Sequence, residues 1–324
     1  MKKTFKRIGF FLLVIITIIV YSGMHLDIPR EELERKYAIG ASQFLDLSDG
    51  ARVHFRDEGE KGHPVIVLLH GFNGSLFNFE HLVPFLIDDF RLVSIDLPGF
   101  GLTGAIPSAV YNTQSFMDTV TTVTSYLDIQ KFSIAGNSMG GRVAWQYAIE
   151  FPDKVLGLVL IASSGVMTNE DRNRIEERKN NFPIVWRLLG SKFIKNFLLL
   201  YTPKFFATQG LKIAVYDQKL ASTRYAKQFH ELTLMEGSRE AILSMERGEE
   251  RKTDAKILSK IKAPTLALFG AEDKIVPLAS SVQFKENVGS IEIKVYENIG
   301  HLPMYEDPKK TAEDISNFLK NKNI

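Results

Sequence analysis

Short runs of apolar residues, each followed by a helix-like stretch, recur along most of this chain. The runs cover residues 65–69, 92–95, 132–135, 155–162, 265–269 and 291–296. Continuous Val, Ile and Leu runs of this length are typical of strands that are covered on both faces. The helical patterns lie at residues 77–88, 115–127, 139–150, 280–287 and 308–322. This alternation predicts a mostly parallel sheet with helices on both sides. An antiparallel pair predicted at 43–47 and 52–56 brings the sheet to eight strands.

Composition excludes several classes of protein. The 324 residues are 45% hydrophobic and 24% charged, which is ordinary for a globular protein and long enough to bury a core without staples. There is no cysteine, so disulfide frameworks, zinc–cysteine clusters and cysteine nucleophiles are excluded. The formal net charge of +2 gives no indication of nucleic-acid binding. We expect neither a metal nor a cofactor.

The first 26 residues differ from the rest. Four basic residues precede an apolar run at residues 8–24, and the run is about as short as a membrane-spanning segment can be. Because the positive charge precedes the run, the body is expected on the extracytoplasmic side, at the periplasm or cell surface. The alternative is a secretory signal that is cut after Ser22, with release of the protein. No A-x-A site is present, which favours the uncleaved anchor. Residues 27–42 are charged and are predicted to form a linker helix.

The chemistry points first to a serine. The sequence Gly136-Asn137-Ser138-Met139-Gly140 connects the apolar run 132–135 to a helical pattern. G-x-S-x-G in this position is typical of a nucleophile elbow, a strained turn that projects the serine hydroxyl above the sheet. The two glycines are needed because the turn leaves no room for a Cβ atom two residues to either side. The alternative is a glycine-rich turn that serves packing alone.

An oxyanion hole is predicted beside this serine. His70-Gly71-Phe72 ends the run 65–69, and the backbone amides of Phe72 and Met139 are the expected donors to the oxygen that becomes negative in acyl transfer. His70 itself is interpreted as structural, because it precedes the serine in chain order.

The base and the acid are predicted from the last third of the chain. Of seven histidines, only His301 follows a strand in this part, in a loop that contains Gly300 and Pro303. A serine hydroxyl needs such a base to become nucleophilic. Asp273 follows the run 265–269 and is the predicted orienting carboxylate; its neighbour Glu272 is ranked lower, and a simple turn aspartate is the alternative.

Together these motifs resemble the α/β-hydrolase superfamily over residues 43–322, in which the order Ser, Asp, His is expected. The resemblance implies a serine hydrolase with the catalytic triad Ser138, Asp273 and His301. It also implies that Asp96, in Asp96-Leu-Pro-Gly-Phe-Gly101, belongs to a loop beside the site. The predicted core is then 43–165 with 263–324.

The elbow Gly136-Asn-Ser-Met-Gly-Gly141 is similar to that of two groups within the superfamily. One comprises signal-bearing bacterial lipases and esterases, and the other comprises hydrolases that cleave carbon–carbon bonds in ring-fission products. In the second group a tryptophan commonly follows the catalytic histidine, where this chain has Leu302. Esterase or lipase activity is therefore predicted. Carbon–carbon hydrolysis of a keto-dienoate is the runner-up, and a non-catalytic binding module is a third possibility.

Residues 166–262 interrupt the strand–helix alternation and are predicted to form a helical cap over the catalytic loops. Their many aromatic residues are interpreted as cap packing, or in part as an acyl-chain pocket under a lid. The candidate pocket residues are Arg142 and Trp186. Arg142 would meet a substrate carboxylate or pair with an acid such as Asp96. An apolar cap and an apolar N-terminus together favour a small-molecule or lipid ester, with the membrane contacted through the N-terminal segment.

Overall fold

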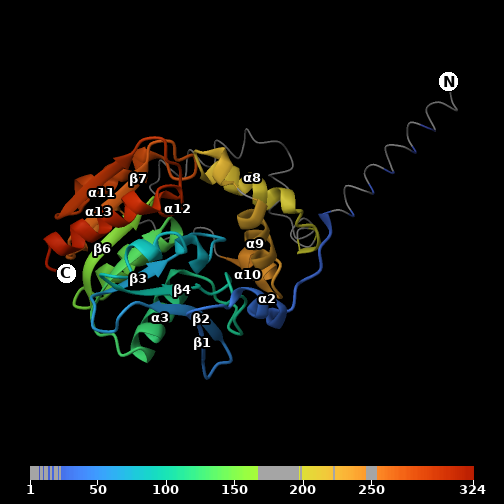
Figure 1. Cartoon of the computed structure of the whole chain (residues 1–324), viewed down its shortest axis with the longest axis horizontal. Helices are drawn as coiled ribbons and strands as arrows, with labels where there is room; N and C mark the ends of the chain where they lie inside the picture. The colour runs from blue at the N-terminus through green and yellow to red at the C-terminus, as the bar shows by residue number, and fades with distance from the viewer. Residues whose placement is uncertain are drawn as a thin grey trace.

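The computed structural model describes residues 23–166, 199–221, 223–245 and 254–324, with the single residues 7, 10, 14, 17, 21 and 197. Its centre is an eight-stranded sheet in the order β1-β2-β4-β3-β5-β6-β7-β8 (Figure 1). Strands β1 and β2 are antiparallel to their neighbours, and all other pairs are parallel. The predicted fold class is therefore confirmed. The strands are β1 (Ser42–Asp46), β2 (Arg52–Glu58), β3 (Val65–Leu69), β4 (Arg91–Ile95), β5 (Phe132–Asn137), β6 (Val155–Ile161), β7 (Thr265–Gly270) and β8 (Ile291–Tyr296).

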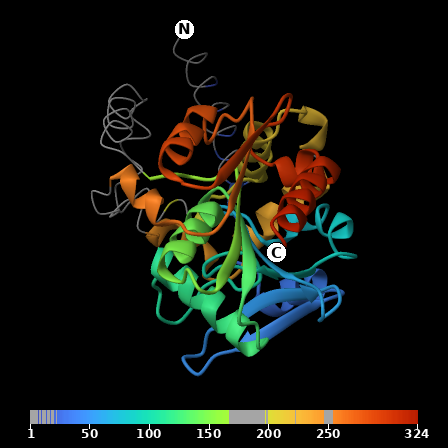
Figure 2. The ribbon, with the colours of Figure 1, turned by 90° about the vertical axis from the view of Figure 1, so that its left-hand side faces the viewer.

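Both faces of the sheet are covered, which explains why the strands read as continuous apolar runs. Successive side chains of β3 enter different cores, Ile66 and Leu68 one and Val67 and Leu69 the other. One face packs on α3 (Thr113–Tyr126), α4 (Met139–Glu150) and α11 (Ser281–Asn287). The other packs on η1 (Leu76–Phe79), η2 (Val83–Phe85), α12 (Pro303–Glu306) and α13 (Pro308–Asn321). The layers are visible when the molecule is viewed from the side (Figure 2).

The strand bounds agree with the predicted ones to within two residues, but one helix prediction is wrong. Residues 77–88 do not form a single helix; they contain the two short 3₁₀ segments η1 (Leu76–Phe79) and η2 (Val83–Phe85). Two features favour this outcome. The side chain of Asn78 accepts the N–H of Ser75 at 2.8 Å, and Pro84 has no N–H to donate.

The described part of the predicted cap consists of helices. They are α8 (Lys204–Ala214), η3 (Gln218–Leu220), α9 (Thr223–Thr233), α10 (Ser238–Ser244) and η4 (Ala255–Lys260). Helices α8, α9 and α10 lie together beside the sheet (Figure 1). The remaining short segment of the fold is η5 (Leu278–Ser280), which precedes α11.

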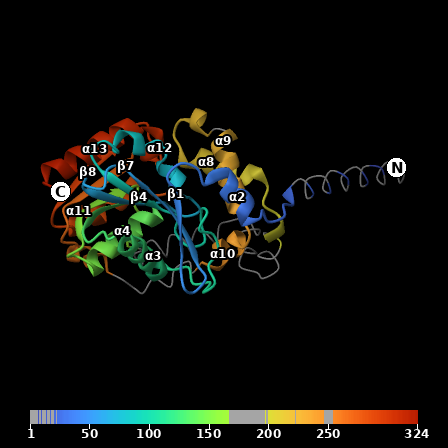
Figure 3. The same cartoon turned by 60° about the horizontal axis from the view of Figure 1, so that its bottom comes forward.

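The segment predicted as a linker forms α2 (Arg30–Tyr37), and it packs on the body, a contact that its charged sequence did not indicate. Leu33 is buried in a cluster that includes Leu102 of the core and Leu232 of α9. Arg30 donates to the carbonyl oxygens of Leu102 and Thr103 at 2.9 and 3.0 Å. Helix α2 therefore contacts the core and the cap together (Figure 3).

The apolar run 8–24 falls mainly outside the described residues. Within the part of the chain that the structure describes, no helix combines the length and the apolar character that crossing a bilayer requires. The N-terminal membrane anchor therefore stays a prediction, as does the alternative of a cleaved signal.

Candidate active site

Ser138 occupies the turn between β5 and α4 that the sequence indicated. Its φ is +53° and its ψ is −114°, a strained backbone conformation for a residue other than glycine. A Cβ atom on Gly136 would lie 2.2 Å from the carbonyl oxygen of Gly140, and one on Gly140 would lie 2.3 Å from that of Leu69. The two flanking glycines are therefore required by backbone contacts on both sides of the serine.

Backbone hydrogen bonds hold Ser138 in this conformation. Its N–H donates to the carbonyl oxygen of Ile161 at 3.0 Å, and its own carbonyl accepts the N–H groups of Arg142 and Ser164 at 3.1 Å each. The side chain lies at the amino end of α4, where the first N–H groups of a helix have no partner within the helix. Met139 is the first residue of that helix. The serine thus sits beside backbone donors and the positive end of the helix.

The loop after β3 approaches the serine from the other side. A Cβ atom on Gly71 would lie 3.2 Å from the Cβ of Ser138, so Phe72 follows a residue in direct contact with the serine. His70 fixes this loop: its Nε2 accepts the N–H of Leu97 at 3.0 Å, and its Nδ1 is 2.8 Å from the Gly71 carbonyl oxygen. Because Leu97 donates to Nε2, the proton of His70 is on Nδ1. Burial lowers the pKa of His70 and favours this neutral form. The contacts agree with the predicted structural role of His70.

Asp273 and His301 are brought together by the loops after β7 and β8. The Oδ2 atom of Asp273 is 2.7 Å from Nδ1 of His301, and both residues are buried. The other carboxylate oxygen accepts the N–H groups of Ile275 and Val276 at 2.7 and 2.9 Å. Glu272, the alternative acid, instead accepts the N–H of Ile299 at 3.2 Å.

Two further residues hold the His301 loop and were not predicted from the sequence. Asn137 donates to the carbonyl oxygens of His301 and Ile161 at 3.1 Å each. Glu306 accepts the N–H groups of Gly300 at 2.9 Å, Leu302 at 3.2 Å and, from the cap, Tyr216 at 2.6 Å. Burial raises the pKa of the Glu306 carboxyl above its usual range. In the sequence, these two residues could have been recognised only by their positions: Asn137 follows the first elbow glycine, and Glu306 comes five residues after the histidine.

A cavity of about 420 Å³ joins these loops to the cap. Ser138 and His301 both line it, together with Phe72 and Asn137. The cap contributes mainly apolar or small residues of α8 and α9. These are Phe206, Ala207, Gly210, Leu211, Ala214, Tyr225 and Phe229. The described lining contains no Lys, Arg, Asp or Glu. The cavity can therefore enclose an uncharged, largely apolar molecule next to the serine and the histidine.

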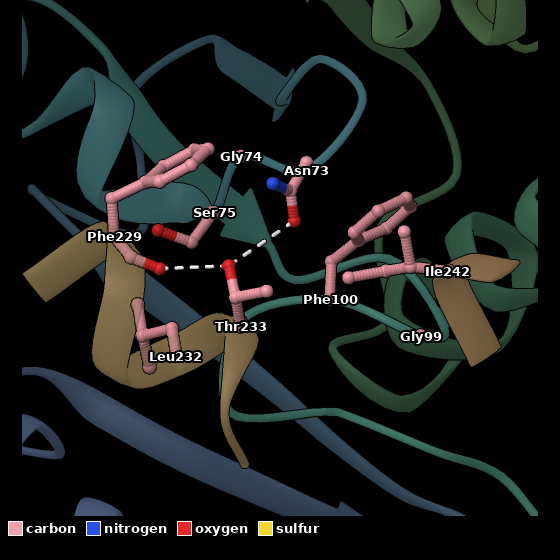
Figure 4. Close-up of a pocket in the computed structure, with 10 residues that line it drawn as sticks. Asn73, Gly74, Ser75, Gly99, Phe100, Phe229, Leu232, Thr233 and Ile242 are labelled. Atoms are coloured by element: carbon pink, nitrogen blue, oxygen red, sulfur yellow. Dashed lines mark hydrogen bonds between the residues drawn. The ribbon is translucent and has the colours of Figure 1, made fainter. Parts of the chain in front are cut away.

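The polar part of the lining lies where the cap meets the loop after β3. The Oγ1 atom of Thr233 lies 3.4 Å from Oδ1 of Asn73 and donates to the Phe229 carbonyl oxygen at 2.9 Å (Figure 4). Asn73 and Thr233 also line the large cavity. Behind them is a void of only about 10 Å³, so the cap and the loop are in close contact here.

The structure places the remaining candidates elsewhere. Arg142 is half-buried on α4 and is not among the residues that line the cavity. Asp96, its suggested partner, instead accepts from the backbone N–H groups of Leu76 and Leu102 and lies 2.7 Å from Nδ1 of His54. Trp186 lies outside the described residues. Within the described ranges, no three His, Asp or Glu side chains form a group that would hold a metal ion.

Comparison with known proteins identifies the family. A sequence profile of the alpha/beta hydrolase fold matches residues 64–308. The human monoacylglycerol lipase ABHD6 is 25% identical over 271 residues, 81% of this chain and 77% of the lipase. The 2-hydroxymuconate semialdehyde hydrolase of Pseudomonas sp. (strain CF600) is 26% identical over 283 residues, 84% of this chain and 92% of that enzyme.

A solved structure of a bacterial membrane phospholipase A superposes with a TM-score of 0.70 at 22% identity, over 100% of this chain and 99% of that one. At that identity the likeness shows the fold alone. The eight-stranded sheet, the strained serine turn and the matched profile agree, and this chain belongs to the alpha/beta hydrolase family.

Proposed function

We propose that the protein is a serine hydrolase that cleaves carboxylic esters with an apolar acyl chain. In this proposal His301 Nε2 removes the hydroxyl proton of Ser138 as the serine attacks the ester carbonyl. The backbone N–H groups of Phe72 and Met139 stabilise the resulting oxyanion. The alcohol leaves with the proton from His301, and water then releases the acid from the acyl-serine by the same steps. Asp273 keeps the His301 proton on Nδ1 and stabilises the imidazolium.

The observation that carries this proposal is the cavity itself. Its volume of about 420 Å³ falls within the usual range of about 300–1,000 Å³ for small-molecule sites. Both the serine and the histidine line it. Its described lining is otherwise apolar, apart from uncharged polar side chains and a second histidine, His230. An ester with a hydrocarbon chain and a neutral alcohol fits such a lining.

The relatives suggest two reactions, because one is a lipase and another, at similar identity, is a carbon–carbon hydrolase. The chemistry of the cavity lining favours one of these reactions over the other. A keto-dienoate carries a carboxylate, and a buried carboxylate needs a cationic partner. The described cavity residues include no lysine or arginine. By contrast, the amide of Asn73 and the hydroxyl of Thr233 can pair with the hydroxyl groups of a polyol ester such as a monoacylglycerol.

An active-site probe tests whether the fold is catalytic. A fluorophosphonate should label the wild type, lose its signal in Ser138→Ala, and keep it in Ser133→Ala, which changes a buried serine on β5, the strand that precedes the Ser138 turn. Labelling that survives in Ser138→Ala would place the nucleophile elsewhere. No labelling of the folded wild type would favour the non-catalytic binding module.

A substrate series tests the reaction. Turnover of p-nitrophenyl esters from two to sixteen carbons, and of monoacylglycerols, is compared with turnover of a keto-dienoate. We expect kcat/KM to rise with chain length until the cavity is filled. Faster turnover of the keto-dienoate than of every ester would contradict the proposal.

We also propose an extracytoplasmic location, based on the basic residues that precede the apolar run 8–24. Mass measurement of the mature N-terminus separates an uncut anchor from a cleaved signal. Protease added to spheroplasts, from which any outer membrane has been removed, should digest the body, and full protection of the body would contradict this orientation.

A further inference from the structure

The outer face of α8 exposes large apolar side chains. Phe205 and Ile213 are 63% and 50% exposed, and with Gln209 they follow one another at four-residue intervals along one side of the helix. The opposite side, with Ala207 and Leu211, is buried. A helix on a soluble surface normally shows polar residues at its outer positions, whereas the row Phe205, Gln209 and Ile213 has only one polar member. Exposed apolar patches of this kind mark contact surfaces.

The start of α8 is joined to an extended N-terminal segment, residues 23–29, which we call the strap. The N–H of His25 donates to the Leu200 carbonyl oxygen at 3.0 Å, and the N–H of Thr202 donates to that of Gly23 at 2.8 Å. Further along, the strap pairs with Leu234 and Glu236 through Ile28. Two of its side chains face solvent, Met24 at 48% exposed and Leu26 at 84%. Leu200, next to the strap, is also half exposed.

This apolar surface lies next to exposed residues of α8 that line the active-site cavity. Phe206 is half exposed and also lines the cavity, as does its exposed neighbour on the next turn, Gly210. The cavity therefore opens along the side of α8 that carries the exposed residues.

The composition around the surface indicates a lipid bilayer as the occupant. Helix α8 carries Lys204 and Lys212 and no acidic residue, which suits contact with an anionic membrane interface. The strap continues directly from the apolar run 8–24, which has four basic residues before it. A bilayer that receives this run would lie beside the exposed side chains of the strap. The alternative occupant of this surface is a second copy of the chain. That copy would have to cover the exposed side chains of the strap while leaving the adjoining apolar run 8–24 free to enter the bilayer.

We propose that the outer face of α8 and the exposed side chains of the strap dock on the membrane interface, so that the cavity mouth opens into the bilayer. The docking surface comprises Met24, Leu26, Leu200, Phe205 and Ile213. Docking does not depend on the reaction. Its consequence, that a lipid ester enters from the bilayer and not from water, rests on the proposed function.

The fold connects this surface to the catalytic loop. At the carboxyl end of α8, the carbonyl oxygen of Ala214 accepts the N–H of His301 at 2.6 Å, and the N–H of Tyr216 donates to Glu306. Helix α8 is thus held at one end by the strap and at the other by the His301 loop. A membrane that holds the strap and α8 would keep the cavity mouth and the histidine in a fixed relation.

Site-directed labelling tests the docking directly, because the chain has no native cysteine. An environment-sensitive fluorophore is attached to Ile213→Cys or to the matched control Val282→Cys on α11, whose side chains are 50% and 48% exposed. The full chain is mixed with phosphatidylcholine–phosphatidylglycerol vesicles. We expect the label at 213 to brighten severalfold and to be quenched by a lipid-borne quencher, and the label at 282 to stay unchanged.

Two outcomes of the labelling overturn the proposal. If neither label responds although the protein floats with the vesicles, the N-terminal run alone binds the membrane. If the label at 213 brightens with protein concentration in the absence of vesicles and is not quenched by lipid, the surface binds a second copy of the chain.

Charge substitution tests the consequence for substrate entry. Neither Phe205 nor Ile213 lines the cavity. Phe205→Asp and Ile213→Asp should each raise the KM for a monoacylglycerol held in vesicles by about tenfold or more, because a large apolar contact is lost. They should leave hydrolysis of water-soluble p-nitrophenyl acetate unchanged, and Val282→Asp should change neither. Equal KM values in vesicles would overturn bilayer entry. If the label on Ile213→Cys inserts into the vesicles but the wild type hydrolyses no ester, the proposed function is refuted and the docking remains intact.

Discussion

Replacing Asp273 with asparagine is expected to invert the proton arrangement of His301. In the native site the Oδ1 atom of Asp273 accepts two backbone N–H groups, from Ile275 and Val276, and Oδ2 faces Nδ1 of His301 at 2.7 Å. Backbone donors select the oxygen of the new amide, so the amide nitrogen takes the position of Oδ2. An amide nitrogen can only donate, so Nδ1 must accept and the proton of neutral His301 moves to Nε2.

A histidine with its proton on Nε2 has no lone pair there to accept the hydroxyl proton of Ser138. Losses in kcat of about 10⁴-fold, or about 5.4 kcal/mol of barrier, are typical when the acid of such a triad becomes an amide. We therefore expect this loss in kcat for a p-nitrophenyl ester, with little change in KM. Stopped-flow measurement of the acylation burst should show that acylation is the step that slows.

Glu272→Gln is the matched control, because it changes the neighbouring acid by the same single atom. Its side-chain oxygen can still accept the N–H of Ile299, and the carboxylate that contacts His301 is that of Asp273. We expect activity within about threefold of the wild type, because the amide keeps the backbone contact of this half-buried side chain. A 10⁴-fold loss in Glu272→Gln, or activity within tenfold of the wild type in Asp273→Asn, would refute the assignment of Asp273 as the orienting acid.

Three further perturbations follow from the geometry. Gly140→Ala should abolish activity and lower the thermal midpoint, because its Cβ atom would lie 2.3 Å from the Leu69 carbonyl oxygen; Gly62→Ala, which meets nothing within 4 Å, should leave both unchanged. Burial lowers the pKa of His70, so the unfolded chain binds more protons and stability falls as the pH drops below 6.5. Urea titrations between pH 7.5 and 5.5 give the free energy of unfolding as a function of pH. The slope of that dependence should be smaller in His70→Gln by up to about 1.4 kcal/mol per pH unit, and an unchanged slope would exclude His70 as its source. Gly210→Leu should lower kcat/KM for long-chain esters while sparing the acetyl ester, because Gly210 lines the cavity with open space beside it; equal losses for both esters would argue against an acyl chain in that space.

The centre of the sheet was predictable from sequence because its strands are buried on both faces, and the apolar run 65–69 matches β3 residue for residue. The edge strand β8 also matches its predicted bounds 291–296, although it is only partly buried and alternates apolar with charged residues. Ser138 was predictable for a related reason: a strained turn requires glycines at fixed spacing, so the backbone constraint is written in the sequence. The single helix predicted at 77–88 was wrong because the Asn78 side chain accepts a backbone hydrogen bond from Ser75 and a proline follows. Apolar periodicity records neither feature.

The contacts that assemble the site across the chain were not predictable in the same way. Glu306 binds backbone groups of both its own loop and the cap, and nothing in its local sequence shows that Tyr216 lies within 2.6 Å. The packing of α2 was missed because one buried leucine, Leu33, is a weak signal within a charged segment. Arg142 was predicted as a pocket residue because it directly follows the elbow glycines. Its position along the helix does not show which side of the helix faces the cavity.

Two buried His–Asp pairs in this chain show that such a pair alone does not make a catalytic base. Nδ1 of His54 is 2.7 Å from Asp96, the same distance as between His301 and Asp273. The far nitrogen of His54, however, is buried without a hydrogen-bond partner among the described residues, between the rings of Phe44 and Phe77. His301 instead lines the cavity that Ser138 shares.

Asp96 uses its remaining capacity on backbone N–H groups of two loops, and although burial opposes its ionisation, the contact with His54 holds its pKa below the usual range. The carboxylate of Asp96 therefore fixes loops, whereas that of Asp273 fixes an imidazole with access to substrate. What distinguishes the two pairs is the group that the second ring nitrogen can reach, and a sequence motif that records only histidine and aspartate cannot express it.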